Sequence, residues 1–218
     1  MKIEMFRMKS REDWLEARSD KIGGSDAAAI VGLHPYKSNV ELWEEKMGVR
    51  PAADVSDSAA VQYGAAAEAP IRELFALDFP QFKVDYAENN MWINDLYPWA
   101  HASLDGWLTD QEGRKGILEI KTATIHGRAQ AVKWEDRVPD NYYCQLLHYF
   151  AVTDFRFAIL KARLRQELGD GRMVIKETVY HFDRETNEQD IVWLMQKEYL
   201  FYSSLLHGVK PPRILPEL

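Results

Sequence analysis

The segment 116–122, Gly-Ile-Leu-Glu-Ile-Lys-Thr, is the feature that most restricts how this chain can fold. Its apolar and β-branched residues predict a strand, in which successive side chains point to opposite faces of a sheet. Glu119 and Lys121 therefore share one face, while Leu118 and Ile120 share the other. Such a strand has to pack against a hydrophobic layer through one face, and the charged residues on its other face require water or a charged partner.

The preceding segment predicts a neighbouring antiparallel strand that carries Asp105. If a three-residue loop follows Asp110, then Asp110 faces Arg114 and the same register places Asp105 opposite Glu119. Directly opposed residues lie about 5 Å apart, where like charges repel each other. A divalent cation would offset this repulsion, since Mg²⁺ binds one or two carboxylates together with waters and phosphate oxygens. The Ile120 carbonyl is a further candidate ligand.

A simpler interpretation stays open at this point. Glu119 and Lys121 can lie on a solvated sheet face, with Asp105 as an acid beside a turn, because an isolated Glu-x-Lys on a strand is common. His101 and Ser103 are expected on the same strand face as Asp105, two and four residues before it. Further motifs are therefore needed to decide between a metal site and a solvated sheet face.

The order of the predicted elements indicates one α+β domain with a mixed central sheet over residues 1–218. Helices are expected after Ser10, after Gly24, from Ser38 to Gly48, and over 57–77, 126–135, 140–152 and 184–207, with Pro70 kinking or breaking the fourth. Strands are expected at 82–88 and 90–95 as a hairpin around Asn89-Asn90, at 99–110 and 116–122, and at 155–164 and 172–182 as a hairpin around Gly169-Asp170-Gly171.

Composition excludes several classes of protein. The single cysteine, Cys144, excludes a disulfide framework, a cysteine-based zinc site and an iron–sulfur cluster. No apolar run reaches the roughly 18 residues of a membrane span, and the N-terminus lacks an apolar secretory stretch, so a cytoplasmic protein is expected. The net charge of −7 argues against nucleic acid, but residues 111–165 are basic and residues 51–110 strongly acidic, which allows a basic surface and a separate metal site.

Four motifs occur in a fixed order. They are Trp14…Arg18…Ile22-Gly23-Gly24-Ser25-Asp26, Tyr63-Gly64-Ala65-Ala66-Ala67-Glu68-Ala69-Pro70, Asp105 with Glu119-Ile120-Lys121, and Gln145-Leu146-Leu147-His148-Tyr149. Together they resemble the lambda exonuclease and YqaJ-like phage recombination nucleases of the PD-(D/E)xK superfamily, over about residues 10–153. The family's Pro-Asp step is Leu104-Asp105 here, which leaves the aspartate in place.

The resemblance implies an α/β/α sandwich built on the restriction-endonuclease-like core, with a role for each motif. Two Mg²⁺ ions, for which Mn²⁺ can substitute, would be held by four groups: Asp105, Glu119, the Ile120 carbonyl and Glu68. Lys121 would orient the attacking water and help to deprotonate it. Gln145 would position the water or the scissile strand, with Tyr149 in support.

Arg18 and Ser25 would, by the same resemblance, contact the terminal 5′-phosphate of DNA. Free backbone N–H groups and a nearby arginine do form anion sites. Each motif also has an ordinary explanation: Gly23-Gly24-Ser25 as a plain helix start, Glu68 as a solvent-facing residue, and Gln145 and Tyr149 as packing. No role is assigned to His34 or His148, which are expected at the surface or its boundary.

The activity implied is a magnesium-dependent 5′→3′ exonuclease that digests linear double-stranded DNA and leaves 3′ overhangs for phage-type recombination. A nicking or structure-specific endonuclease and a catalytically silent DNA-end-binding module are the alternatives. The resemblance also implies a homotrimeric ring around DNA, a phage single-strand annealing protein as partner, and phage or prophage origin. Four tryptophans either anchor such an interface or pack in the core: Trp43, Trp92, Trp99 and Trp134.

Overall fold

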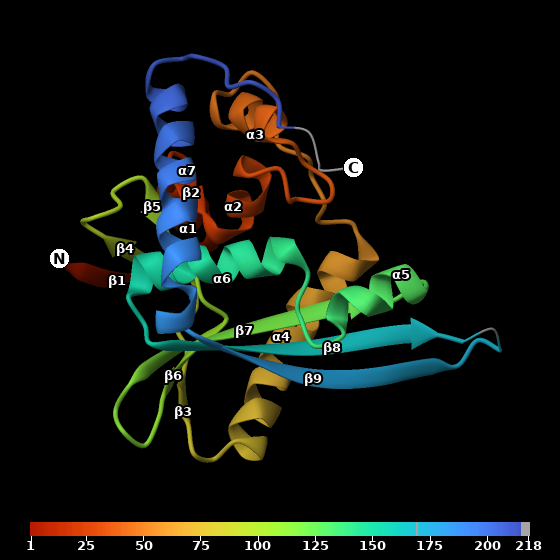
Figure 1. Ribbon diagram of the computed structural model, residues 1–218. Coiled ribbons are helices and arrows are strands. Elements are labelled where there is room, and N and C mark those ends of the chain that lie inside the picture. Colours follow the sequence, from red (N-terminus) through yellow and green to blue (C-terminus); the bar gives the residue numbers. More distant parts are fainter. Residues whose placement is uncertain (169, 215–218) are drawn as a thin grey trace.

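The computed structural model describes residues 1–168 and 170–214. A mixed five-stranded sheet lies at its centre (Figure 1). Its strands, from edge to edge, are β3 (Lys83–Asp85), β6 (Gly106–Thr109), β7 (Lys115–Thr124), β8 (Phe157–Glu167) and β9 (Met173–Asp183). β7 and β8 are parallel and the other neighbours are antiparallel. Two small sheets pair β1 (Ile3–Arg7) with β4 (Asn90–Asn94) and β2 (Ile22–Gly23) with β5 (Ala100–His101).

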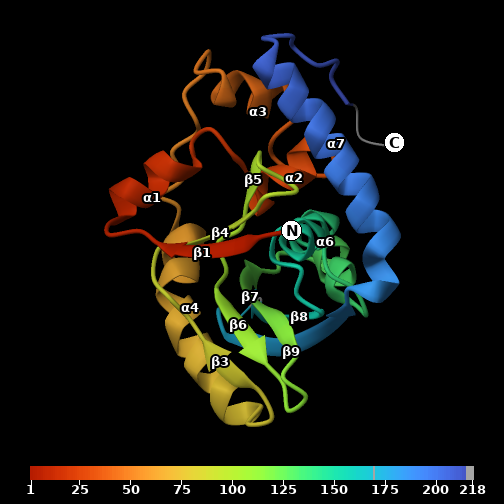
Figure 2. The same ribbon diagram turned by 90° about the vertical axis from the view of Figure 1, so that its left-hand side faces the viewer.

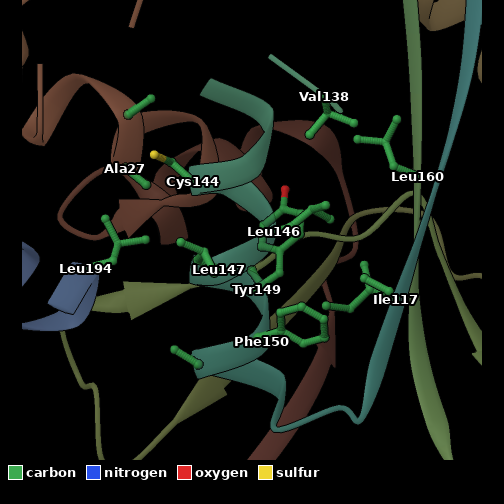
Figure 3. Close-up of a cluster of buried hydrophobic side chains, with 14 of the residues drawn as sticks. Ala27, Ile117, Val138, Cys144, Leu146, Leu147, Tyr149, Phe150, Leu160 and Leu194 are labelled. Atoms are coloured by element: carbon green, nitrogen blue, oxygen red, sulfur yellow. The ribbon is translucent and has the colours of Figure 1, made fainter. Parts of the chain in front are cut away.

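Helices cover both faces of the central sheet. The helices of the described residues are α1 (Arg11–Arg18), α2 (Gly24–Ile30), α3 (Asn39–Lys46), α4 (Ala59–Asp78), α5 (Arg128–Ala131), α6 (Asp140–Thr153) and α7 (Glu188–Leu206), of which α4 and α6 contact β7. On one face, Phe75 of α4 belongs to a buried cluster with Leu118 and Ile120 of β7. On the other, Phe150 of α6 packs in the main core with Ile117 (Figure 3). The predicted α/β/α sandwich is therefore confirmed.

The register between β6 and β7 is the predicted one. Gly106 pairs with Leu118 and Thr109 with Lys115, and the Asp110 N–H donates to the Arg114 carbonyl across the loop. A short loop leaves the chain no other register, so the alternation of side chains follows from it.

The hairpin predicted around Asn89-Asn90 is wrong. β3 pairs with β6 and β4 pairs with β1, so the two segments diverge. Asn90 is buried, and its amide donates to the Ala87 and Leu104 carbonyls while its oxygen accepts from the Leu104 N–H. These bonds tie β4 to the segment before β6, and Asn89 adopts a left-handed φ of 53° to allow it.

The single strand predicted over 99–110 is also wrong. β5 ends at His101 and pairs in parallel with β2, while β6 begins only at Gly106. Ala102 bridges Trp92 of β4 between them. Asp105 therefore lies directly before β6, and His101 belongs to a different sheet.

α4 runs through Pro70, so of the two predicted effects of this proline, a kink or a break, the break does not occur. A proline inside a helix frees the carbonyl four residues earlier, which is that of Ala66. Both residues are exposed, so water can hydrogen-bond to that carbonyl. The β8–β9 hairpin is confirmed, although Gly169 of its predicted turn lies outside the described residues.

The four tryptophans considered above pack inward, in agreement with the core alternative. Trp43 and Trp134 are buried, and Trp92 and Trp99 pack against the buried clusters. Within the described ranges, no helix is both long and apolar enough to cross a membrane.

α7 is attached to the core through a buried ion pair that the sequence analysis missed. His148 and Glu198 are both fully buried, whereas His148 was expected at the surface or its boundary. His148 Nδ1 lies 2.8 Å from Glu198 Oε1, and His148 Nε2 lies 2.8 Å from the His101 carbonyl oxygen. Since both neighbours of the ring are acceptors, both ring nitrogens donate and the imidazole is charged. Burial opposes this charge, but Glu198 and the His101 carbonyl outweigh it and raise the pKa of His148.

The pair makes stability depend on pH. Because the pKa of His148 is raised from 6.5, its contribution is complete below about pH 6.5 and is lost as pH rises through the folded-state pKa. In Glu198→Gln, a neutral His148 accepts from the amide and still donates to the His101 carbonyl, so no such loss is expected.

Urea unfolding should therefore show a larger stability advantage of the wild type over Glu198→Gln at about pH 6 than at about pH 9. Equal differences at the two pH values would contradict a charged His148. Glu198→Ala, which removes one partner of a buried pair, should cost about 3–5 kcal/mol.

Candidate active site

Asp105 and Glu119 meet where β6 begins beside the middle of β7. Asp105 Oδ2 accepts a 2.8 Å hydrogen bond from the Ile120 N–H, which fixes the carboxylate against the strand. Glu119 is 1% exposed, and its Oε1 lies 2.6 Å from Lys121 Nζ. Its other oxygen, Oε2, is buried with no hydrogen-bond partner among the described residues. The structure thus brings together the three side chains that the register predicted.

The electrostatics of this cluster are unbalanced. Burial and the charge of Glu119 raise the pKa of Asp105 well above its ordinary value. Burial also raises the pKa of Glu119, against the opposing effect of Lys121. Burial disfavours the charge on Lys121, but the two carboxylates outweigh it and raise the pKa of the lysine. One cation faces two acids, so a further positive charge would be stabilised here.

Glu68 approaches the cluster from α4, paired with an arginine that sequence analysis missed. Arg72 Nη1 donates to Glu68 Oε1 at 2.9 Å and to the Asp105 carbonyl at 2.6 Å, and its guanidinium lies 3.6 Å from the Tyr86 ring centroid. The Glu68 charge is close enough to raise the pKa of both Asp105 and Glu119. The spacing of four residues between Glu68 and Arg72 was the available signal, since such pairs meet on a helix.

α6 supplies Gln145 and Tyr149 beside the charged face of β7. Gln145 Nε2 donates to the Tyr149 hydroxyl at 2.8 Å, and both side chains are buried. Burial and the Glu119 charge raise the pKa of Tyr149, so the phenol stays protonated. The first turn of α2 packs here too, because a Cβ on Gly24 would lie 2.5 Å from the Tyr149 ring. This contact connects the start of α2 to the acidic cluster.

Arg18 is the last residue of α1, and Ser25 lies in the first turn of α2, directly after the β2–α2 junction. The Arg18 guanidinium stacks on the Trp14 ring, 4.2 Å from its centroid, and approaches Gly23. Trp14 is itself held by its Nε1, which donates to the Asn90 carbonyl and to the Ser103 hydroxyl. Ser25 is exposed in the first turn of α2. Gly23 is the N-cap of this helix, and Asp26, its third residue, accepts from the Gly23 N–H through its carboxylate.

The donor set fits a hard divalent cation. Mg²⁺ and Mn²⁺ bind carboxylate and carbonyl oxygens, and the unpartnered Glu119 Oε2 is a buried oxygen available for that purpose. The fit is incomplete in one respect: in residues 1–168 and 170–214, no three His, Cys, Asp or Glu side chains converge on one point as a ready-made metal site. The hydrogen bond of Glu68 to Arg72 accounts for this, because it holds the third carboxylate toward the arginine.

The model of the YqaJ-like viral recombinase domain matches residues 13–156. The chain belongs to this family. The matched range includes every residue predicted for the site, from Arg18 to Tyr149. The uncharacterized protein YqaJ of Bacillus subtilis (strain 168) is 29% identical over 206 residues, which are 94% of this chain and 59% of the relative. The chain therefore spans less than two thirds of that relative's length.

Solved structures share the fold at low sequence identity. The alkaline exonuclease LHK-Exo from Laribacter hongkongensis superposes with a TM-score of 0.64 at 17% identity, over 91% of this chain and 94% of that one. A complex of LHK-Exo with dAMP superposes equally well. A phage-related exonuclease from Haemophilus somnus 129PT gives a TM-score of 0.55 at 14% identity, over 86% and 96% of the two chains. The family and fold predicted from the motifs are confirmed.

The unbalanced charge predicts that divalent cations stabilise the fold. Mg²⁺ at about 100 times its Kd should raise the free energy of unfolding by about 2.7 kcal/mol, measured by thermal or urea unfolding with and without the ion. Asp105→Asn should lose this gain while remaining, without metal, as stable as the wild type or more stable by up to about 1 kcal/mol, because a like charge has been removed.

Glu112→Gln is the matched control, since Glu112 is an exposed carboxylate in the β6–β7 loop. It should keep the full response to Mg²⁺. A response that survives in Asp105→Asn would place the cation elsewhere.

Proposed function

We propose that this chain is a divalent-metal-dependent deoxyribonuclease that digests linear double-stranded DNA from the 5′ end and leaves 3′ overhangs for recombination. The observation that carries the proposal is the buried Asp105–Glu119 pair beside Lys121, with one Glu119 oxygen unpartnered among the described residues. Membership of a viral recombinase family and the fold of alkaline exonuclease structures support it.

The proposed metal ligands are Asp105, Glu119, the Ile120 carbonyl and Glu68, around two Mg²⁺ or Mn²⁺ ions. When bound, such ions polarise the scissile phosphate and lower the pKa of the attacking water. For Glu68 to ligate a metal ion, its carboxylate must either leave Arg72 or bind the arginine and the metal ion together. The Asp105–Ile120 hydrogen bond orients one carboxylate before any ligand arrives, which limits the entropy lost on binding.

Lys121 and Gln145 are proposed to orient the attacking water, and Lys121 also to help deprotonate it. Without metal, Lys121 is protonated, because the two carboxylates raise its pKa. It therefore serves as a donor that orients the water and the phosphate oxygens, and it could act as a base only after releasing its own proton to solvent, which a bound cation would favour by offsetting the carboxylate charge. Gln145 is held by Tyr149 in a defined rotamer, so its amide can position the water or the scissile strand.

Arg18 and Ser25 are proposed to bind the 5′-terminal phosphate that each cut regenerates. Stacking on Trp14 pre-orients the Arg18 guanidinium, and a guanidinium can grip a phosphate through two parallel hydrogen bonds. Capture of each new end after cleavage would give the reaction its 5′→3′ direction.

The first test is cleavage itself. Asp105→Ala, Glu119→Ala and Lys121→Ala should each abolish Mg²⁺-dependent digestion while DNA binding survives, and Glu112→Gln should digest like the wild type. Linear duplex labelled at either 5′ or 3′ ends, run beside covalently closed duplex, distinguishes the alternatives in one gel. Nicking of closed DNA would indicate the endonuclease alternative, and binding without cleavage the silent end-binding module. Wild-type cleavage by Asp105→Ala would refute the site.

Assembly as a homotrimeric ring is a second part of the proposal, together with a phage single-strand annealing protein as partner in the cytoplasm of a bacterial host. An acidic subunit of 25.3 kDa offers little surface to retain a duplex through many cuts. A closed ring would turn basic residues of the 111–165 segment toward the DNA.

Light scattering should accordingly report about three times the 25.3 kDa subunit mass. A monomer at micromolar concentration that still digests long duplexes processively would refute the ring and leave the nuclease proposal intact.

A further inference from the structure

His101 is a buried histidine whose ring has no partner. It is 2% exposed, and neither Nδ1 nor Nε2 makes a hydrogen bond to any described residue. Two unpaired polar atoms in the interior cost free energy that an apolar side chain of similar size would avoid. The backbone of the same residue, in contrast, is fixed: it pairs with Gly23 across the β2–β5 ladder, and its carbonyl accepts from His148.

The surroundings of the ring are cationic. Burial, followed by the positive charges of Arg18, His148, Lys46 and Lys21, lowers the pKa of His101 to about 2. The imidazole is therefore neutral and carries one N–H donor. Lys46 is paired with Asp26, and Lys21 donates to the Pro98 carbonyl.

Arg18 differs from these lysines. Across residues 1–168 and 170–214, its guanidinium makes neither an ion pair nor a hydrogen bond, and only the Trp14 ring supports it. A cation and a neutral N–H donor, both without acceptors in the described chain, thus lie in one cationic region. Such a combination suits an anion that can accept several hydrogen bonds.

Gly23 brings the two groups together. A Cβ built on Gly23 would lie 2.9 Å from His101 Nε2 and 3.3 Å from Arg18 Nη2. The two nitrogens therefore face the same side of this residue, and any side chain here would crowd both. Glycine at this position lets the His101 ring and the Arg18 guanidinium pack close to the backbone and to each other.

We propose that His101 is a further phosphate-binding residue, which donates its N–H to the 5′-terminal phosphate monoester of DNA alongside Arg18. This inference rests on the end recognition proposed above and adds to it a residue from β5. Arg18 supplies the charge, and His101 supplies a fixed donor whose hydrogen bond is made only when the phosphate is present.

The test compares His101→Leu with Arg18→Gln and with His181→Leu, an exposed histidine on the edge strand β9 as control. Fluorescence anisotropy in EDTA gives the Kd of each protein for 5′-phosphorylated and 5′-hydroxyl duplexes without cleavage. We expect the wild type and His181→Leu to prefer the phosphorylated end, and both other variants to lose about tenfold or more of that preference. His101→Gln, which keeps an N–H donor, should retain more of it than His101→Leu.

Thermal unfolding separates binding from a structural role. A phosphate-binding His101 predicts that His101→Leu unfolds at the wild-type temperature or higher, because two unpaired nitrogens have been removed. A less stable His101→Leu with an unchanged phosphate preference would overturn the proposal. Should His101→Leu fail to fold, His101→Gln decides: a preference between those of the wild type and Arg18→Gln would support the proposal, and a preference equal to that of the wild type, beside a loss in Arg18→Gln, would overturn it. A wild type that binds both ends equally would refute end recognition as a whole, independently of His101.

Discussion

The hydrogen bond from the Ile120 N–H to Asp105 is the contact on which the site depends. It joins the start of β6 to the middle of β7, and it holds a carboxylate beside the buried Glu119. Lys121 compensates the charge of one carboxylate and leaves that of the other uncompensated, so a bound cation would be stabilised in this cluster. A protein gains no stability from such an arrangement by itself. The arrangement is instead suited to binding a cation.

The surrounding helices are arranged around this cluster. α4 supplies Glu68 and the Arg72 contact to the Asp105 backbone, and α6 supplies Gln145 and Tyr149. α2 and α7 both pack on α6, as Figure 2 also shows from a second side. α7 contributes the buried Glu198, whose partner His148 holds the His101 carbonyl. The C-terminal third of the chain therefore does more than complete the fold, because it supports the strand beside which Arg18 lies.

Features set by residues close together in the sequence could be predicted, and those set by residues far apart in the sequence could not. The Asp105–Glu119 register was predictable because a short loop sets it locally. The hairpin at 82–95 was wrong because the buried Asn90 amide bonds to Leu104, a contact between residues 14 apart that no local pattern reveals. The burial of His148 depends on Glu198, fifty residues later. The motifs that led to the family were ordered along the chain, and the three-dimensional structure brings Glu68, Gln145 and Tyr149 together around the charged residues in the middle of β7.

Anomalous diffraction from crystals of the protein soaked in Mn²⁺ would show most directly whether Asp105 and Glu119 bind a metal ion, since it locates the cation without relying on activity. We expect a peak between Asp105 and the free oxygen of Glu119, within the distance of a direct metal–oxygen bond, and its loss in Glu119→Gln crystals. Manganese bound elsewhere, or an unchanged peak in Glu119→Gln, would contradict the assignment of this carboxylate pair as the metal site.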